Sequence, residues 1–209
     1  MTIQDAENIV GGLSQPSKMP CLSFGISAKT CKTGSKLAKI ENSVCSCCYA
    51  LKGFYTYPSV KMAHQKRLKG IRNKFWAEAM ALLIKSNSSN LFFRFFDSGD
   101  IVSYAFFEKI IKLVRLLPDF KFWLPTKEYS IISRWVKING KLPENLTVRL
   151  SGYMVDEKGP EIIANKLGCV VSEVRTNNWD CPSSTQGGKC LTCRACWDKS
   201  VPVVSYKKH

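Results

Sequence analysis

The sequence predicts an α/β protein in which parallel strands alternate with helices. Four short runs rich in β-branched and aromatic residues indicate strands at 91–96, 120–124, 146–151 and 169–174. Helical patterns lie between these runs, and such alternation is typical of parallel βα units. Four to five units suit a partial (β/α) barrel or an open parallel sheet, because a closed barrel of βα units has eight strands.

The helices are predicted from capping residues, apolar stripes and stop signals. Ser103 is placed to cap a helix with a continuous apolar stripe, and Pro118 marks the end of that helix. Gly140 follows a second helical pattern as a stop signal, and Pro160 stands at the first position of a third. We therefore expect helices at 58–74, 75–85, 103–117, 129–139 and 160–167.

Composition divides the chain into an irregular Cys-rich arm, a βα core and an irregular Cys-rich tail. With 209 residues, of which 45% are hydrophobic, the chain is expected to form one domain, 1–209. The arm (1–57) and the tail (175–209) hold nearly all of the ten cysteines, whereas the core (58–174) holds the regular patterns. The N-terminus has no secretory pattern and no apolar run reaches a membrane span, so we expect a reducing, cytoplasmic location and no membrane partner.

Four cysteines in the tail have the spacing of metal ligands. Cys181 is followed by Cys190, Cys193 and Cys196, and the last three stand at consecutive x2 spacing. Zinc ribbons separate two Cys-x2-Cys pairs by a loop, whereas consecutive x2 steps are closer to ferredoxin-type ligation. We therefore interpret the tail as a 4Fe-4S site. Tetrahedral zinc is the alternative, and reduced or disulfide-bonded thiols are a third interpretation.

A second set of cysteines lies in the arm. Cys45 and Cys48 form an x2 pair, and Cys31 is a candidate third ligand. Cys47 is interpreted as a spectator, because adjacent side chains reach one metal only with backbone strain. Three ligands would leave a 4Fe-4S cluster with an open iron for a substrate or cofactor; alternatively, the arm shares one cluster with a tail cysteine. Two other cysteines are interpreted as small buried residues, Cys21 and Cys169.

Polar residues follow the predicted strands, and parallel strands send the loops at their carboxyl ends to one edge of the sheet. The first strand ends in an acidic loop in which Gly99 lets a ligand approach the backbone. A small-molecule substrate or cofactor is therefore expected at this edge. The candidate catalytic residues are Asp97, Asp100, Lys127, Glu128 and Arg149. The candidate cofactor-binding residues are Tyr49, Ser98, Gly99 and Ser151.

The same polar residues also have a local interpretation. Asp and Ser side chains after a strand often cap the next helix, and Glu128 and Arg149 could form a salt bridge. The fourth predicted strand adds Ser172, Glu173 and Arg175 to this edge.

The formal charge of +15 raises a second kind of function. The segment 57–77 contains six basic residues and no acidic residue, and on the predicted helix 58–74 the basic side chains would face outward. Such a face suits nucleic-acid phosphates, although a solvated helix surface has the same composition.

Several stretches resemble a known family. They occur in one order between about residue 18 and the C-terminus, and they read KTCKTGSKLAKIENSVCSCCYALKGFY, FFRFFDSGDI, FWLPTKEY and CPSSTQGGKCLTCRACW. On these stretches the chain resembles the phage-encoded "gene product 88" proteins. The resemblance implies a protein of the infected host's cytoplasm. It also implies seven ligand positions, Cys31, Cys45, Cys48, Cys181, Cys190, Cys193 and Cys196.

More distantly, the chain resembles radical S-adenosylmethionine (SAM) enzymes. These have a partial βα barrel, a three-Cys 4Fe-4S cluster with an open iron, and an acidic Gly-containing motif after the second strand. The loop Asp97–Asp100 would be the counterpart of that motif, while the first cysteine gap is 13 residues here and three in that family. This resemblance implies a 4Fe-4S protein that acts as a SAM-dependent radical or redox enzyme. The alternatives are a redox carrier and a non-enzymatic zinc or iron–sulfur module that binds nucleic acid or a host protein.

Overall fold

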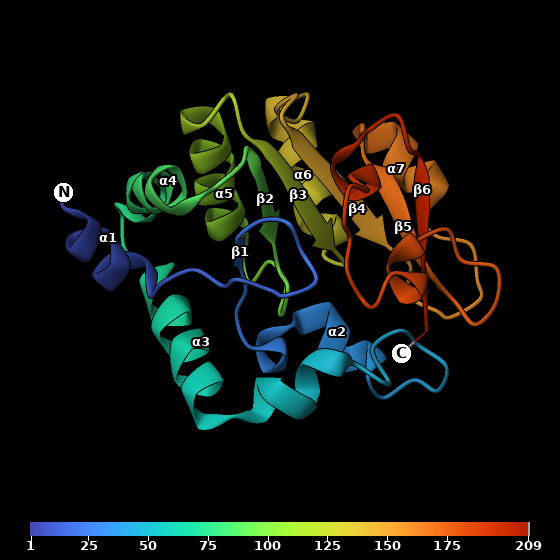
Figure 1. Ribbon diagram of the computed structural model, residues 1–209. Coiled ribbons are helices and arrows are strands. Elements are labelled where there is room, and N and C mark those ends of the chain that lie inside the picture. The colour runs from blue at the N-terminus through green and yellow to red at the C-terminus, as the bar shows by residue number, and fades with distance from the viewer. Residues whose placement is uncertain (209) are drawn as a thin grey trace.

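Six parallel strands form one open sheet in the computed structural model, which describes residues 1–208 (Figure 1). Each strand pairs with its neighbour in the chain, so the order across the sheet is β1 to β6. The predicted α/β class is confirmed, and the sheet is not a closed barrel. The strands are β1 Ser23–Phe24, β2 Phe92–Phe95, β3 Lys121–Thr126, β4 Leu146–Ser151, β5 Val170–Arg175 and β6 Val203–Lys207.

The two outermost strands were not predicted. β1 has two residues, too few for a periodic pattern, and it pairs with Arg94 and Phe95 of β2. β6 lies within the tail, where only the short run Val203–Tyr206 could have indicated a strand. The arm and the tail therefore each contribute one edge strand, so neither is wholly irregular.

Seven helices and five short 3₁₀ turns occupy the described chain. Ser103 caps α5 as predicted, since its hydroxyl accepts the backbone N–H of Phe106. The predicted helix 58–74 ends early, because the Asn73 side chain accepts the N–H of Phe75 in a turn. The helices are α1 Ile3–Val10, α2 Lys32–Leu37, α3 Pro58–Gly70, α4 Trp76–Asn87, α5 Tyr104–Leu116, α6 Tyr129–Asn139 and α7 Glu161–Leu167. The 3₁₀ turns are η1 Ala28–Thr30, η2 Tyr49–Leu51, η3 Gly53–Thr56, η4 Pro182–Thr185 and η5 Ala195–Trp197.

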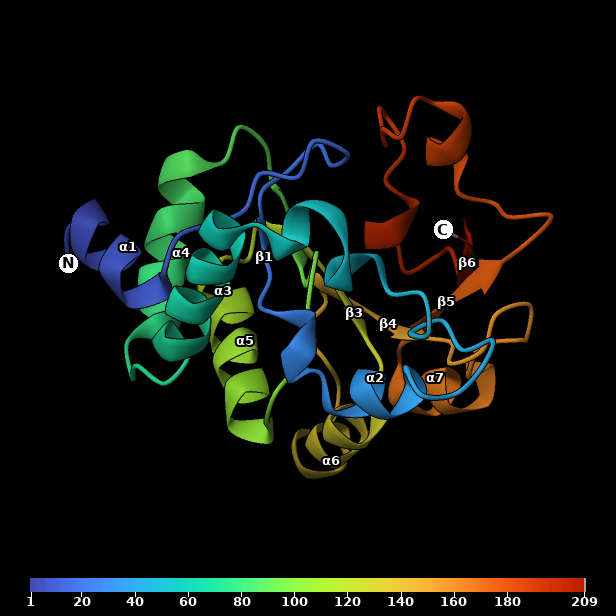
Figure 2. The same cartoon turned by 90° about the horizontal axis from the view of Figure 1, so that it is seen from below.

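The two faces of the sheet have different chemistry, because successive strand residues point to opposite faces. Helices α5, α6 and α7 cover one face, while the tail lies over the other, as Figure 2 shows. Apolar strand residues such as Phe93, Phe122 and Val148 belong to the core on the helical face. Their neighbours Arg94 and Trp123 lie on the opposite face, which we call the inner face. No helix within residues 1–208 has the length and apolar content needed to cross a membrane.

Arg149 attaches the tail to the inner face. The side chain is fully buried, and its guanidinium donates five hydrogen bonds to backbone carbonyls. Four of those carbonyls belong to the tail and one to β5, at distances of 2.6–3.1 Å. No ion pair joins it to Glu128 among the described residues, so the salt bridge considered from the sequence is wrong. The accepting residues are Val171, Ala195, Cys196, Asp198 and Val201.

Candidate functional site

A cavity of about 500 Å³ opens at the carboxyl edge of the sheet, and the arm, the strand ends and the tail all line it. Thirteen of the sixteen residues that the sequence marked as candidates line this one space. They are Cys31, Cys45, Cys48, Tyr49, Asp97, Ser98, Gly99, Asp100, Lys127, Ser151, Cys181, Cys190 and Cys196. The other three, Cys193, Glu128 and Arg149, are not part of its lining.

The arm cysteines surround the first turn of α2. A side-chain carbon at Gly34 would lie 3.8 Å from the sulfur of Cys31 and 3.6 Å from the sulfur of Cys45. The two sulfurs therefore face a common space that the glycine leaves open. Burial, followed by the charge of Asp100, raises the pKa of Cys31 to about 12, while Lys127 acts in the opposite direction. The thiol is protonated at neutral pH unless a metal displaces its proton.

The tail cysteines form a second group on the other side of the cavity. The sulfur of Cys196 lies 3.2 Å from the Tyr206 hydroxyl, and that of Cys181 lies 3.2 Å from the Ser183 hydroxyl. Burial raises the pKa of Cys190, and the neighbouring Cys181 and Cys193 add to that shift. Among residues 1–208, no three Cys, His, Asp or Glu side chains converge closely enough to hold a single metal ion.

The cysteines interpreted as non-ligands have three different environments. Cys169 lies in the core on the helical face, and Cys21 packs with Trp123 and Trp197 on the inner face. Both are buried, and burial raises the pKa of each to about 12. Cys47, in contrast, lines the cavity beside Cys48, so it has access to the same space as the arm ligands.

The loop Asp97–Asp100 forms the floor of the cavity next to the arm. The Asp97 carboxylate accepts a hydrogen bond from Ser23 at 2.7 Å, and its backbone carbonyl accepts one from the Tyr49 hydroxyl at 2.7 Å. The Asp100 carboxylate accepts the Thr126 hydroxyl at 2.6 Å and two backbone N–H groups at 2.8 Å. Burial nevertheless raises the pKa of Asp100 to about 6. The loop therefore offers the cavity a carboxylate that three hydrogen bonds hold in place.

Glu128 holds the arm rather than lining the cavity. It is buried, and its carboxylate accepts the backbone N–H of Thr33 in the first turn of α2 at 2.9 Å. α2 has no side-chain cap of its own, since Cys31 occupies the capping position without such a bond. A residue 95 positions away thus caps the helix that begins beside Cys31.

Replacing Glu128 with alanine is expected to lower the free energy of unfolding by about 1.5–3 kcal/mol, because a hydrogen bond to a buried charged acceptor is lost. Glu128→Gln keeps an oxygen acceptor and should cost less. Urea denaturation measures both, with Glu144→Ala as control because the Glu144 side chain is 92% exposed. Equal losses in Glu128→Ala and Glu144→Ala would contradict this role.

Comparison with known proteins identifies the family. The model of the family described as Gene product 88 matches residues 4–199, which is most of the chain. The chain belongs to the Gene product 88 family. The resemblance predicted from about residue 18 onward is therefore confirmed and extends further toward the N-terminus. All seven predicted ligand cysteines lie within the part of the chain that this Gene product 88 model matches.

No curated protein and no solved structure matches the chain. The more distant resemblance to radical SAM enzymes is not shown by these comparisons and stays a prediction.

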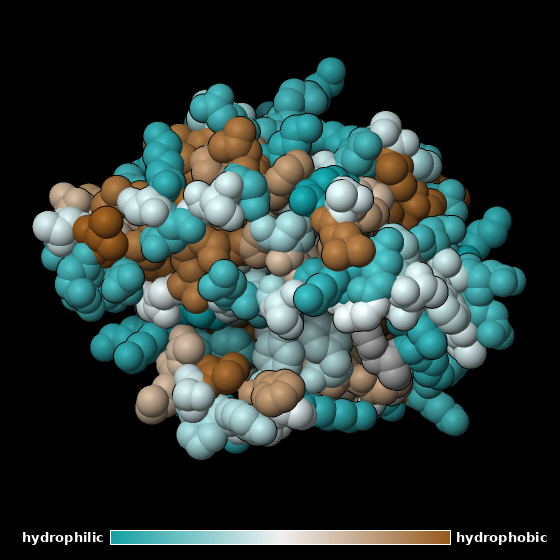
Figure 3. Space-filling model, in the orientation of Figure 1, coloured by the Kyte–Doolittle hydropathy of each residue, from teal (hydrophilic) through white to brown (hydrophobic). Residues whose placement is uncertain are grey.

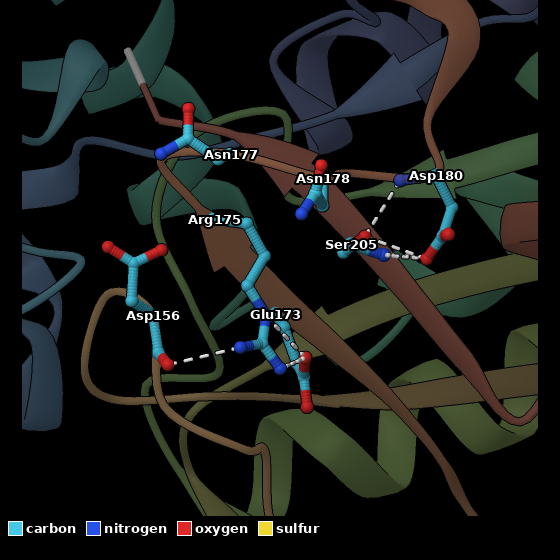
Figure 4. A pocket seen from close by; sticks show the side chains of 7 residues that line it. All are labelled: Asp156, Glu173, Arg175, Asn177, Asn178, Asp180 and Ser205. Carbon is cyan, nitrogen blue, oxygen red and sulfur yellow. Dashed lines mark hydrogen bonds and ion pairs between the residues drawn. The ribbon is translucent and has the colours of Figure 1, made fainter.

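A second, polar pocket of about 300 Å³ adjoins the cavity of this Gene product 88 chain, and Glu173 lines both (Figure 4). Arg175 pairs with the Glu173 carboxylate and donates to the Asp156 carbonyl at 3.0 Å. The Ser205 hydroxyl donates to the Asp180 carboxylate at 2.7 Å, which joins the segment after β5 to β6. The carboxylates of this pocket thus brace the loops at the end of β5 and β6.

Among the cavity residues that the sequence did not mark are Arg94 and Trp123. They are register partners on β2 and β3. The alternation in the run LFFRFF could have revealed Arg94, because a strand that buries Phe93 and Phe95 on one face must send Arg94 to the other. Trp123 could not be recognised as a cavity residue, because it stands in the apolar run FKFWL and a buried core position would have the same composition.

Proposed function

We propose that Cys31, Cys45 and Cys48 hold a 4Fe-4S cluster at the carboxyl edge of the sheet, next to a small molecule bound in the cavity. The observation that carries this proposal is the common cavity, which the three arm cysteines share with the loop Asp97–Asp100. Thiolates are the ligands that iron–sulfur clusters prefer. When bound, such a cluster supplies one-electron chemistry and, with three protein ligands, an iron open to a further ligand.

The order of the elements supports a relation to radical SAM enzymes. β1 precedes the arm cysteines, so Asp97–Asp100 follows the second strand of the sheet, the place of the acidic Gly-containing motif in that family. Six parallel strands in sequential order are also what a partial βα barrel requires. SAM is therefore the cofactor that we propose for the open iron, in a radical or redox reaction.

The cavity residues have roles that follow from their contacts. Gly34 keeps the space between two arm sulfurs free, which suits a group larger than a side chain. Burial raises the pKa of Cys31 and of Cys45, and the charge of Lys127 opposes that rise. The same charge would offset that of an anionic cluster. Asp100, whose carboxylate is fixed by three hydrogen bonds, would orient an amino or hydroxyl group of the small molecule. These residues supply orientation and electrostatics.

The four tail cysteines would hold a second, larger cluster, since they do not converge as closely as a single zinc ion requires among the described residues. Cys190 and Cys193 are close neighbours, since the N–H of Cys193 donates to the Cys190 carbonyl at 2.9 Å. Arg149 fixes the segment that contains Cys196 to the sheet. A single cluster shared between arm and tail remains the competing arrangement, because both groups border one cavity.

Anaerobic purification followed by iron, sulfide and zinc analysis tests the cluster. Replacing Cys31, Cys45 or Cys48 with serine should remove the arm's iron and sulfide, because each supplies one ligand. Cys47→Ser is the matched control, since Cys47 lines the same cavity but is proposed as a spectator. A colourless protein with stoichiometric zinc and no sulfide would refute the proposal. If the cluster is present but SAM does not change its electron paramagnetic resonance signal, a role as a redox carrier is favoured.

A second candidate function is the binding of single-stranded nucleic acid, and an exposed aromatic and basic surface favours it. No acidic residue occurs between Glu41 and Glu78. Phe54 is 75% exposed, and its ring contacts that of Tyr57 edge to face. Figure 3 shows brown and tan side chains among teal ones at the lower edge, where Figure 1 places α3. The same segment carries exposed lysines at positions Lys52, Lys61, Lys66 and Lys69.

The basic residues available for nucleic-acid contact on helix α3 differ from those that the sequence suggested. Arg67 does not take part, since it is buried and donates to the Gly12 carbonyl at 3.0 Å and to Ser14 at 2.6 Å. Phe75, which follows α3, is 48% exposed and adds a further aromatic ring to the surface of this basic segment.

Fluorescence anisotropy with a labelled single-stranded oligonucleotide tests this surface. Phe54→Ala is expected to weaken binding by about 1–3 kcal/mol through loss of base stacking. Lys66→Ala should reduce the dependence on salt between about 50 and 200 mM. Ile162→Ala on α7, 73% exposed in the native chain, is the control. No binding at low salt would exclude this function, and equal effects of the Phe54 and Ile162 variants would exclude the stacking contact.

A further inference from the structure

Three residues that line the main cavity each have a buried polar atom without a hydrogen-bond partner. These atoms are the Arg94 Nε, the Ser98 hydroxyl and the Trp123 Nε1, and all three are buried within the part of the chain that the structure describes. Ser98 and Trp123 are each 3% exposed. A buried polar atom without a partner is unfavourable, because it has lost its hydrogen bonds to water and gained none in exchange. Three such atoms around one cavity indicate that a ligand completes their hydrogen bonds.

Arg94 and Trp123 form the centre of this group. They are opposite each other on β2 and β3, and the guanidinium carbon lies 4.4 Å from the centre of the indole ring. No carboxylate stands within ion-pair distance of Arg94 among residues 1–208. Its Nη2 donates to the Phe96 carbonyl at 3.3 Å, and the guanidinium also hydrogen-bonds with the Tyr49 side chain. The positive charge of Arg94 therefore has no carboxylate in direct contact among the described residues.

The chemistry of the three groups selects the ligand. Guanidinium and indole N–H groups only donate, and a serine hydroxyl can donate as well, so the ligand must bring acceptors. A planar guanidinium matches the two oxygens of a carboxylate or phosphate. We propose that Arg94, Ser98 and Trp123 bind an anionic group, a carboxylate or phosphate, of the small molecule in the cavity. This rests on the proposed function only in taking the cavity as the substrate site.

Binding of small anions to the intact protein tests this inference. Acetate and methylphosphonate are the probes, and saturation-transfer difference NMR detects their methyl groups. Acetamide, which has the shape of acetate without its charge, is the neutral control. Both anions should bind better than acetamide if an anion site exists, and the preferred anion distinguishes a carboxylate from a phosphate. Binding of neither anion above the level of acetamide would overturn the proposal.

Variants locate the binding. Trp123→Phe keeps an aromatic ring but removes the N–H, and it should weaken anion binding about tenfold or more, since a hydrogen bond to a charged group is lost. Trp76→Phe is the matched control, because the Trp76 N–H also lacks a partner but lies in the core on the helical face. Arg94→Lys keeps the positive charge but loses the planar pair of N–H donors, so it should also weaken anion binding. Equal effects of the two tryptophan variants would overturn the proposal.

Metal analysis of the same samples separates this inference from the cluster proposal. Loss of tail iron or zinc in Arg94→Lys, with anion binding unchanged, would assign the guanidinium to the tail thiolates and overturn the anion site. Selective anion binding by a protein without sulfide would support the anion site and refute the cluster. Iron and sulfide without anion binding would refute only the anion site.

Discussion

Replacing Arg149 with methionine should lower the free energy of unfolding by about 3–5 kcal/mol, because the buried carbonyls that it serves would lose their donor. Methionine fills a similar space, so lost packing contributes little. Four of the five carbonyls belong to the segment 195–201, so the tail should separate from β4 before the rest of the sheet unfolds.

Two measurements check this expectation. Urea denaturation gives the change in the free energy of unfolding, and hydrogen exchange reports whether the amides of the tail lose protection. Arg115→Met on α5 is the control, because Arg115 is exposed. An unfolding free energy equal to that of the control, with the tail still protected, would show that the carbonyls find water or other donors. Loss of tail metal together with tail protection would link this clamp to the cysteines.

Replacing Gly99 with alanine should destabilise the protein by about 3 kcal/mol or more, through backbone strain and a steric clash. The backbone at Gly99 has φ +84°, a conformation that alanine adopts only with strain. An added Cβ would also lie 2.7 Å from the Ile26 carbonyl oxygen and 2.6 Å from the Ile26 side chain. The loop Asp97–Asp100 would have to move away from β1, which would open the cavity floor.

Gly140→Ala separates the two causes. Gly140 has φ +82°, but no heavy atom lies within 4 Å of an added Cβ. It should therefore show only the cost of backbone strain, about 1–3 kcal/mol. Thermal or urea denaturation compares the two variants, and iron content reports on the site. If the two variants lose the same free energy of unfolding, the clash with Ile26 is relieved without loss of stability. The close approach of Gly99 to Ile26 is then not required for folding.

Sequence patterns predicted the middle of the fold well, because its elements are specified locally. Ser103 caps α5, and Gly168 ends α7 in a left-handed conformation, as their residue types suggest. The alternating residues of β4 carry both the core side chains and the buried Arg149. The two edge strands escaped prediction because their pairing depends on partners far along the chain: Ser23 pairs with Arg94.

The sequence predicted which residues belong to the candidate site better than it predicted what each residue does there. Topology sends strand ends to one edge, so Asp97 and Lys127 could be grouped before any contact was known. Glu128 and Arg149 could not be assigned from the sequence, because their partners are backbone groups of distant segments. Glu128 reaches Thr33 of the arm, and Arg149 reaches carbonyls of the tail. No side-chain pattern encodes such partners.

The sequence by itself determined the class of the fold, the family and the chemistry available, since hydrophobic periodicity and cysteine spacing are local properties. Only the tertiary structure decided that the arm and the tail border one cavity and that Arg94 and Trp123 belong to its wall. The physical reason is that burial and hydrogen-bond satisfaction depend on which distant groups meet. The sequence alone does not distinguish an arginine whose N–H donors all have acceptors, as in Arg149, from one with an unpartnered Nε, as in Arg94.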